Sequence, residues 1–137
     1  MTDDTMSDSG ADTDPETPAR VMAMFARRLA AGDLDGLVAM YADDAVFQPA
    51  PGVELRGGEI RAALGELVGL RPTITYHGEP AVLHCGDLAL VSNDWSMEGT
   101  APDGSIVSEG GCSADVVRRN AVGAWKILID QPSGTPR

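Results

Sequence analysis

The apolar residues of this chain follow a helical period in its first half and a strand period in its second half. Three segments, from about Pro18 to Gly32, Leu34 to Tyr41 and Gly58 to Arg71, carry apolar side chains three and four positions apart. That spacing places the side chains on one face of a helix. The third segment has the most regular pattern, and Pro72 ends it. The sequence therefore predicts three helices.

Capping residues mark the boundaries of the first two helices. Thr17 precedes Pro18, an arrangement typical of an N-cap followed by proline in the first turn. Gly32 can adopt the left-handed conformation that closes a helix, and Asp33 can cap the next one. We therefore expect one helix to end at Gly32 and a short second helix to begin after Asp33.

The residues after Pro72 predict a series of strands. Short turn segments at 86–87, 102–104 and 120–123 separate the last four runs, and such connections join antiparallel neighbours. Glycines 110 and 111 predict a bulge or bend, whereas the prolines after Phe47 argue against a central strand there. Helices followed by such a meander predict an α+β fold, with three helices packed on a curved, mainly antiparallel sheet of five or six strands. The predicted strands are Thr73–His77, Ala81–Cys85, Leu88–Gly99, Ile106–Arg119 and Ala124–Asp130.

Length and charge predict one domain with an acidic tail. The chain has 137 residues and a formal net charge of −11. Residues 1–17 contain acidic but no basic side chains and almost no large apolar ones, so we expect this tail to be disordered. Residues 18–134 are then a single domain.

The same composition excludes several classes of partner. Nucleic-acid binding is not expected, because binders neutralise phosphates with basic grooves. Lys126 is the only lysine, and no membrane span or signal peptide is recognisable. Cys85 and Cys112 lie far apart in the sequence without a metal-binding pattern, which favours reduced thiols in a cytoplasmic protein without a metal.

A family resemblance comes from the stretch GDLDGLVAMYADDAVF, residues 32–47. It resembles the second-helix region of the nuclear transport factor 2-like superfamily, which includes ketosteroid isomerases, SnoaL-like polyketide cyclases and scytalone dehydratases. The similarity extends from about Arg20 to Gly134. The ending WKILIDQPSG looks like that of an SgcJ/EcaC-type subgroup, several members of which belong to enediyne and other polyketide pathways.

The resemblance implies a cystatin-like α+β cone with a cavity for a small hydrophobic molecule, and a homodimer formed through the sheet. No Gly-rich dinucleotide motif is present, so no cofactor is expected. The resemblance further implies a cavity lined by Phe25, Tyr41, Phe47, Gln48, Leu64, Trp95, Cys112 and Trp125.

The ketosteroid isomerases use a carboxylate base, a tyrosine and a protonated aspartate. Alignment on the same stretch puts Phe25 at the tyrosine position and Gln48 or Pro49 at the base position. Only Asp115 falls near the position of the acid. Steroid isomerisation by that mechanism is therefore not expected.

Candidate catalytic residues come from the predicted strands. If Asp115 faces the cavity, burial would raise its pKa and leave a hydrogen-bond donor; if it faces outward, it pairs with a nearby arginine or with solvent. Asp94 lies in an unusually polar part of its strand. His77 and His84 could act as a general base beside either aspartate, or lie on the surface. Further strand carboxylates, which could form an acid–base pair if two converge, are Glu98, Glu109 and Asp130.

Three functions remain open: a cofactor-free isomerase, cyclase, dehydratase or hydrolase acting on a polyketide-like metabolite; a non-catalytic carrier of a hydrophobic ligand; and a dimeric interaction module. An open cavity with two convergent ionisable groups would favour the enzyme, and a purely apolar cavity would favour the carrier. A cavity filled by side chains would favour the interaction module.

Overall fold

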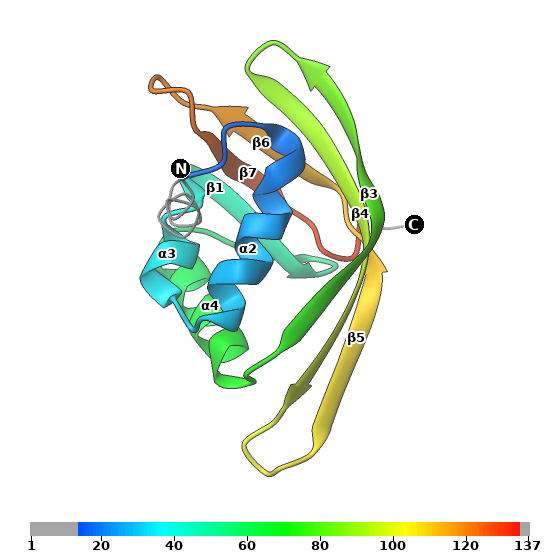
Figure 1. Cartoon of the computed structure of the whole chain (residues 1–137). Helices are drawn as coiled ribbons and strands as arrows, with labels where there is room; N and C mark the ends of the chain where they lie inside the picture. The colour runs from blue at the N-terminus through cyan, green and yellow to red at the C-terminus, as the bar shows by residue number, and fades with distance from the viewer. Residues whose placement is uncertain (1–13, 135–137) are drawn as a thin grey trace, which may run out of the picture.

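A computed structural model describes residues 14–134, which form three helical segments of α type, one 3-10 turn and a seven-stranded sheet. The helices lie on one side of the curved sheet (Figure 1). The predicted α+β architecture is therefore confirmed, although the sheet has more strands than expected. The elements are η1 (Pro18–Arg20), α2 (Val21–Ala30), α3 (Leu34–Val38), β1 (Tyr41–Ala50), β2 (Val53–Leu55), α4 (Gly58–Gly69), β3 (Thr73–Cys85), β4 (Leu88–Thr100), β5 (Ile106–Cys112), β6 (Asp115–Arg119) and β7 (Trp125–Asp130).

The strand order is β2-β1-β7-β6-β4-β3, and β5 pairs with β4. Every pairing is antiparallel except that of β1 with β7, which is parallel. Because β4 is long, it pairs with β6 through residues 88–91 and with β5 through residues 94–100. The hairpin of β4 and β5 extends away from the body of the domain (Figure 1).

The second predicted helix is shorter than expected, and the strand after it is longer. Tyr41 belongs to β1 rather than to α3, because its strand pairs with Ile127 of β7. β1 lies between β2 and β7, but its pairing with β7 ends at Phe47. The prolines after Phe47 therefore do not lie in a centrally paired part of a strand, as expected, and the pairing with β2 shifts between Phe47 and Ala50.

The predicted strand Ile106–Arg119 is divided into β5 and β6. The division lies at Ser113 and Ala114, just beyond the glycines where a bend was expected. Ser113 bridges the gap, because its backbone N–H donates to the Asn93 carbonyl and its hydroxyl accepts from the Asn93 N–H. The polar run in β4 thus marks the place where this strand changes partners.

The chain reversal between α2 and α3 follows the predicted capping pattern. Gly32 has φ of +69°, and the Asp33 carboxylate accepts a hydrogen bond from the Gly36 N–H at 2.9 Å. Arg28 is buried and donates to the Gly36 carbonyl at 2.8 Å. The Thr17 side chain does not form the predicted cap. The Thr17 carbonyl accepts a hydrogen bond from the Arg20 N–H.

Residues 1–13 of the acidic tail lie outside the described residues. The last part of the tail contacts the domain. Asp14 pairs with Lys126 at 2.8 Å and with Arg28, and the Pro15 carbonyl accepts from the Trp125 N–H. Within residues 14–134, no helix has the length and apolar character needed to cross a membrane.

Candidate functional site

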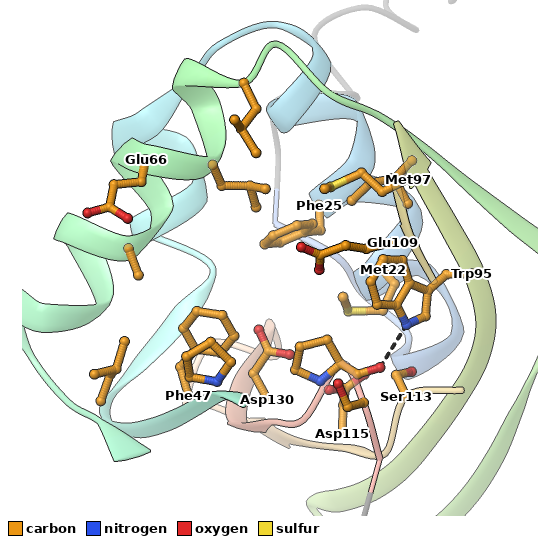
Figure 2. Close-up of a pocket in the computed structure, with 18 of the residues that line it drawn as sticks. Met22, Phe25, Phe47, Glu66, Trp95, Met97, Glu109, Ser113, Asp115 and Asp130 are labelled. Carbon is orange, nitrogen blue, oxygen red and sulfur yellow. Dashed lines mark hydrogen bonds between the residues drawn. The ribbon is translucent and has the colours of Figure 1, made fainter. Parts of the chain in front are cut away.

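A cavity of about 650 Å³ lies between α2, α4 and the concave face of the sheet (Figure 2). Most of its wall is apolar, as expected for a site that takes up a hydrophobic molecule. Four aromatic side chains and several aliphatic ones form this part of the wall: Met22, Phe25, Phe47, Leu55, Leu67, Leu70, Ile74, Tyr76, Trp95 and Met97.

Two aspartates from neighbouring strands form the most deeply buried polar part of the wall. Asp115 is the first residue of β6 and Asp130 is the last residue of β7. Both carboxyl groups line the cavity, although Asp115 is 0% and Asp130 only 4% exposed. Figure 2 shows the two side chains next to each other at the base of the cavity. Two groups whose charged forms are disfavoured by burial thus meet at one site.

Backbone and side-chain hydrogen bonds hold the two carboxyl groups in place. The Tyr41 hydroxyl donates to Asp130 Oδ2 at 2.5 Å, and the Gln131 N–H donates to Asp115 Oδ1 at 3.0 Å. Asp115 Oδ2 is buried without a donor to accept from among the described residues. If Asp115 carries a proton on this oxygen, it can donate to the neighbouring Asp130.

The pKa values of Asp115 and Asp130 are affected by different interactions. Burial, followed by the charge of Asp130 and their mutual hydrogen bond, raises the pKa of Asp115 well above its usual range. Burial also raises the pKa of Asp130, but hydrogen bonds from Tyr41 and Asp115 oppose this and stabilise its charged form. Both pKa shifts therefore disfavour two negative charges at this site, and the hydrogen bonds favour Asp130 over Asp115 as the charged member of the pair.

Tyr41 remains a hydrogen-bond donor to this pair. Burial and the charge of Asp130 raise the pKa of Tyr41 well above its ordinary value. Burial likewise raises the pKa of Tyr76, which lines the cavity. Both phenols are accordingly neutral at physiological pH.

The other predicted catalytic residues lie away from the cavity. Asp94 and His77 are paired directly across β4 and β3 and are exposed on the convex face. His77 Nε2 lies 2.8 Å from the Ser96 hydroxyl. His84 is exposed, and its ring stacks on Trp125 with centroids 5.2 Å apart. The suggestion that a histidine stands beside an aspartate in the cavity is therefore not supported.

The predicted lining residues divide into two groups. Phe25, Phe47 and Trp95 do line the cavity, and Tyr41 lies behind Asp130. Trp95 is fixed by a 2.7 Å hydrogen bond from its indole N–H to the Pro132 carbonyl (Figure 2). The remaining four are not part of the wall. Gln48 lies between two residues that line the cavity, Leu64 and Trp125 are buried in the core, and Cys112 is exposed beside Ser92.

Strand register explains the lining residues that were not predicted. Tyr76 is paired with Trp95, and Glu109 with Met97, so all four side chains share the concave face. Asp130 was considered only as one of several strand carboxylates. Among residues 14–134, no three His, Cys, Asp or Glu side chains are arranged to hold a metal ion.

Comparison with known proteins identifies the fold. The model of the SnoaL-like domain family matches residues 21–124. A nuclear transport factor 2-like superfamily protein from Salmonella enterica has a TM-score of 0.76, with 17% identity over 95% of this chain and 94% of that chain. A candidate scytalone dehydratase from Novosphingobium aromaticivorans has a TM-score of 0.75, with 15% identity over 100% and 99%.

Aln2 from a Streptomyces species is similar over 83% of this chain and 85% of its own, with 20% identity and a TM-score of 0.69. No match was found among curated proteins. At these identities the structural similarities show the nuclear transport factor 2-like cone and leave the reaction to be argued from the site.

Proposed function

Because the chain belongs to the SnoaL-like domain family, we propose that it is a cofactor-free acid–base enzyme acting on a hydrophobic, polyketide-like metabolite. The observation that supports this most strongly is the pair of Asp115 and Asp130, two buried carboxyl groups with raised pKa values and different hydrogen-bond partners in the wall of an apolar cavity. A carboxylate and a carboxylic acid side by side supply both partners of a proton transfer.

In this mechanism Asp130 is the base. Its carboxylate removes a proton from a carbon next to a substrate carbonyl, and the electron pair of that C–H bond moves onto the carbonyl oxygen. Asp115 donates its proton or a hydrogen bond to that oxygen. Return of the proton to another carbon completes an isomerisation, whereas departure of a β-hydroxyl group as water completes a dehydration. Tyr41 orients Asp130 and is a positioning residue.

A non-catalytic carrier of a hydrophobic ligand is the second candidate. The apolar wall supports it, because burial of apolar surface alone can provide affinity. The convergent carboxyl groups favour the enzyme, since burying two of them has a free-energy cost that a carrier does not need. An interaction module with a filled interior does not fit a cavity of about 650 Å³.

Two finer assignments belong to the same proposal. The C-terminal WKILIDQPSG run supports a place near the SgcJ/EcaC-type subgroup and hence in polyketide or enediyne metabolism. Leu83, Leu88 and Leu90 lie exposed on the convex face of β3 and β4, which supports a homodimer formed through the sheet. Sedimentation of a Leu90→Glu variant would test the dimer.

The acid–base assignment can be tested without knowing the natural substrate. We would incubate the protein with 2-tetralone, a hydrophobic bicyclic ketone, in D2O and follow deuterium incorporation next to the carbonyl by mass spectrometry. Asp130→Asn should reduce the protein-dependent rate by about 100-fold or more, because removing a general base costs that much. Asp94→Asn is the matched control, since Asp94 lies on the opposite face, and it should exchange as the wild type does.

Exchange that is equal in the wild type and in Asp130→Asn would contradict the assignment. Binding of 2-tetralone without protein-dependent exchange would favour the carrier.

A further inference from the structure

The charged residues in the cavity wall all have the same sign. Besides Asp115 and Asp130, three glutamates line the cavity, namely Glu59, Glu66 and Glu109. None of the described lining residues is lysine, arginine or histidine. An apolar cavity with only acidic groups accepts neutral or positively charged molecules and repels anions.

Glu109 has no neutralising cation beside it among the described residues, unlike several acids on the surface. Within residues 14–134, Asp35, Asp44 and Asp87 each pair with an arginine at 2.6–2.7 Å. Glu109 forms no ion pair or hydrogen bond in this part of the chain. Its position on β5 is opposite Met97, so its side chain leaves the concave face of the sheet. Figure 2 shows its carboxylate pointing into the cavity, toward Phe25.

Aromatic side chains surround the space into which Glu109 points. Phe25 and Trp95 line the same cavity, and the hydrogen bond to Pro132 holds the Trp95 indole in place. The faces of aromatic rings attract cations, tryptophan most strongly. A carboxylate and aromatic faces together therefore form a chemical environment suited to an ammonium group.

Resting on the proposed function, we infer that the substrate is an amphipathic cation: a mainly apolar ring system that carries a basic amine. Its ammonium group lies at Glu109 near Phe25 and Trp95. The oxygen-bearing part of the molecule is left for Asp115 and Asp130. Glu109 is then a specificity-determining residue, and the formal net charge of −11 adds long-range attraction for cations.

A set of three ligands that differ only in one group tests this inference. They are naphthalen-2-ylmethylamine, naphthalen-2-ylmethanol and 2-naphthoate, whose binding would be measured by calorimetry at pH 7 and at two salt concentrations. Because Glu109 is exposed, its interaction with a cation is partly screened by water. We expect the amine to bind about fivefold more tightly than the alcohol, the naphthoate to bind most weakly, and high salt to reduce the differences.

Glu109→Gln should remove most of the advantage of the amine and leave the affinity for the alcohol within about twofold. Glu98→Gln is the matched control, because it removes the same charge from the opposite face of the neighbouring strand. It reports the long-range contribution alone and should preserve the preference for the amine.

Equal binding of amine and alcohol, or a Glu109→Gln variant that weakens all three ligands alike, would overturn the inference while leaving the acid–base proposal intact. Loss of deuterium exchange in Asp130→Asn is measured on a neutral ketone and does not depend on Glu109. Absence of binding by all three ligands would overturn the inference and also the small-molecule role of the cavity.

Discussion

Replacing Asp115 with asparagine removes an ionisable group and retains its shape. The asparagine oxygen can still accept the hydrogen bond that the Gln131 N–H donates to Asp115 Oδ1. Its amide N–H takes the place of the carboxylic proton and can donate to Asp130. The variant therefore imitates the protonated acid that we assign to the native cavity, at every pH.

The expected effect on stability follows from proton uptake. Because the pKa of Asp115 is raised in the folded protein, folding at neutral pH requires either proton binding or burial of a charge. The unfavourable contribution is absent below the pKa of an unfolded aspartate, about 3.9. It grows by about 1.4 kcal/mol for each pH unit above that value while the folded group stays protonated. At pH 6 it can therefore reach about 3 kcal/mol.

Asp115→Asn should consequently be more stable than the wild type by about 1–3 kcal/mol at pH 6–7 and nearly equal to it at pH 4. Urea unfolding followed by circular dichroism across this pH range measures the difference. The same variant should slow deuterium exchange into 2-tetralone, because the amide N–H can hydrogen-bond to the developing oxyanion but is a far weaker acid than a carboxyl group. A variant that is less stable by the same amount at pH 4 and pH 7 would refute the assignment of a protonated Asp115.

Two further substitutions test the support of the site and of the fold. Tyr41→Phe removes the donor to Asp130, so the pKa of Asp130 should rise further and the acidic limb of the exchange rate should move to higher pH. Tyr76→Phe, which removes a hydroxyl with no hydrogen bond to Asp130 among the described residues, should leave the limb in place. Gly36→Ala should lower the free energy of unfolding, measured by urea unfolding, by about 1–2 kcal/mol. The added Cβ would clash with the carboxylate of Asp33 that caps the helix. Gly65→Ala, whose Cβ meets only Leu34 at 3.8 Å, should be neutral or stabilising, and equal effects of the two would contradict the capping argument.

The local signals in the sequence predicted the helices and their connection well. Gly32 and Asp33 act through groups within four residues of themselves, so their roles can be inferred without tertiary information. The extent of β1 could not be inferred in this way. Its pairing with β7 joins segments more than 80 residues apart, and this pairing rather than local propensity draws Tyr41 into a strand.

Which side chains line the cavity depends on strand register, and local sequence patterns do not determine the register. Asp94 and Asp115 both lie in β-rich runs, but a strand directs alternate side chains to opposite faces. Pairing of Asp115 with Val91 places it on the buried face, whereas Asp94 is paired with exposed Cys112. Only the register distinguishes the two.

The sequence does not distinguish Asp130 from the other strand carboxylates for a similar reason. Its neighbours in the sequence predict a strand end, and its partner Tyr41 is separated from it by 89 positions. The convergence of Asp115 with Asp130 also requires the register shift between β6 and β7 at Val116 and Val117. Neither feature leaves a local pattern in the sequence.

The most direct test of the account is a titration of the carboxyl carbons of Asp115 and Asp130 by 13C NMR, with Asp115→Asn and Asp130→Asn for assignment. We predict that the Asp115 carbon remains in its protonated position at pH values where ordinary aspartates have ionised, and that Asp130 ionises at a lower pH than Asp115. In Asp130→Asn, the pKa of Asp115 should fall, because the neighbouring charge is gone. Ionisation of both carboxyl groups near pH 4 in the wild-type protein would contradict the shared proton and, with it, the proposed chemistry.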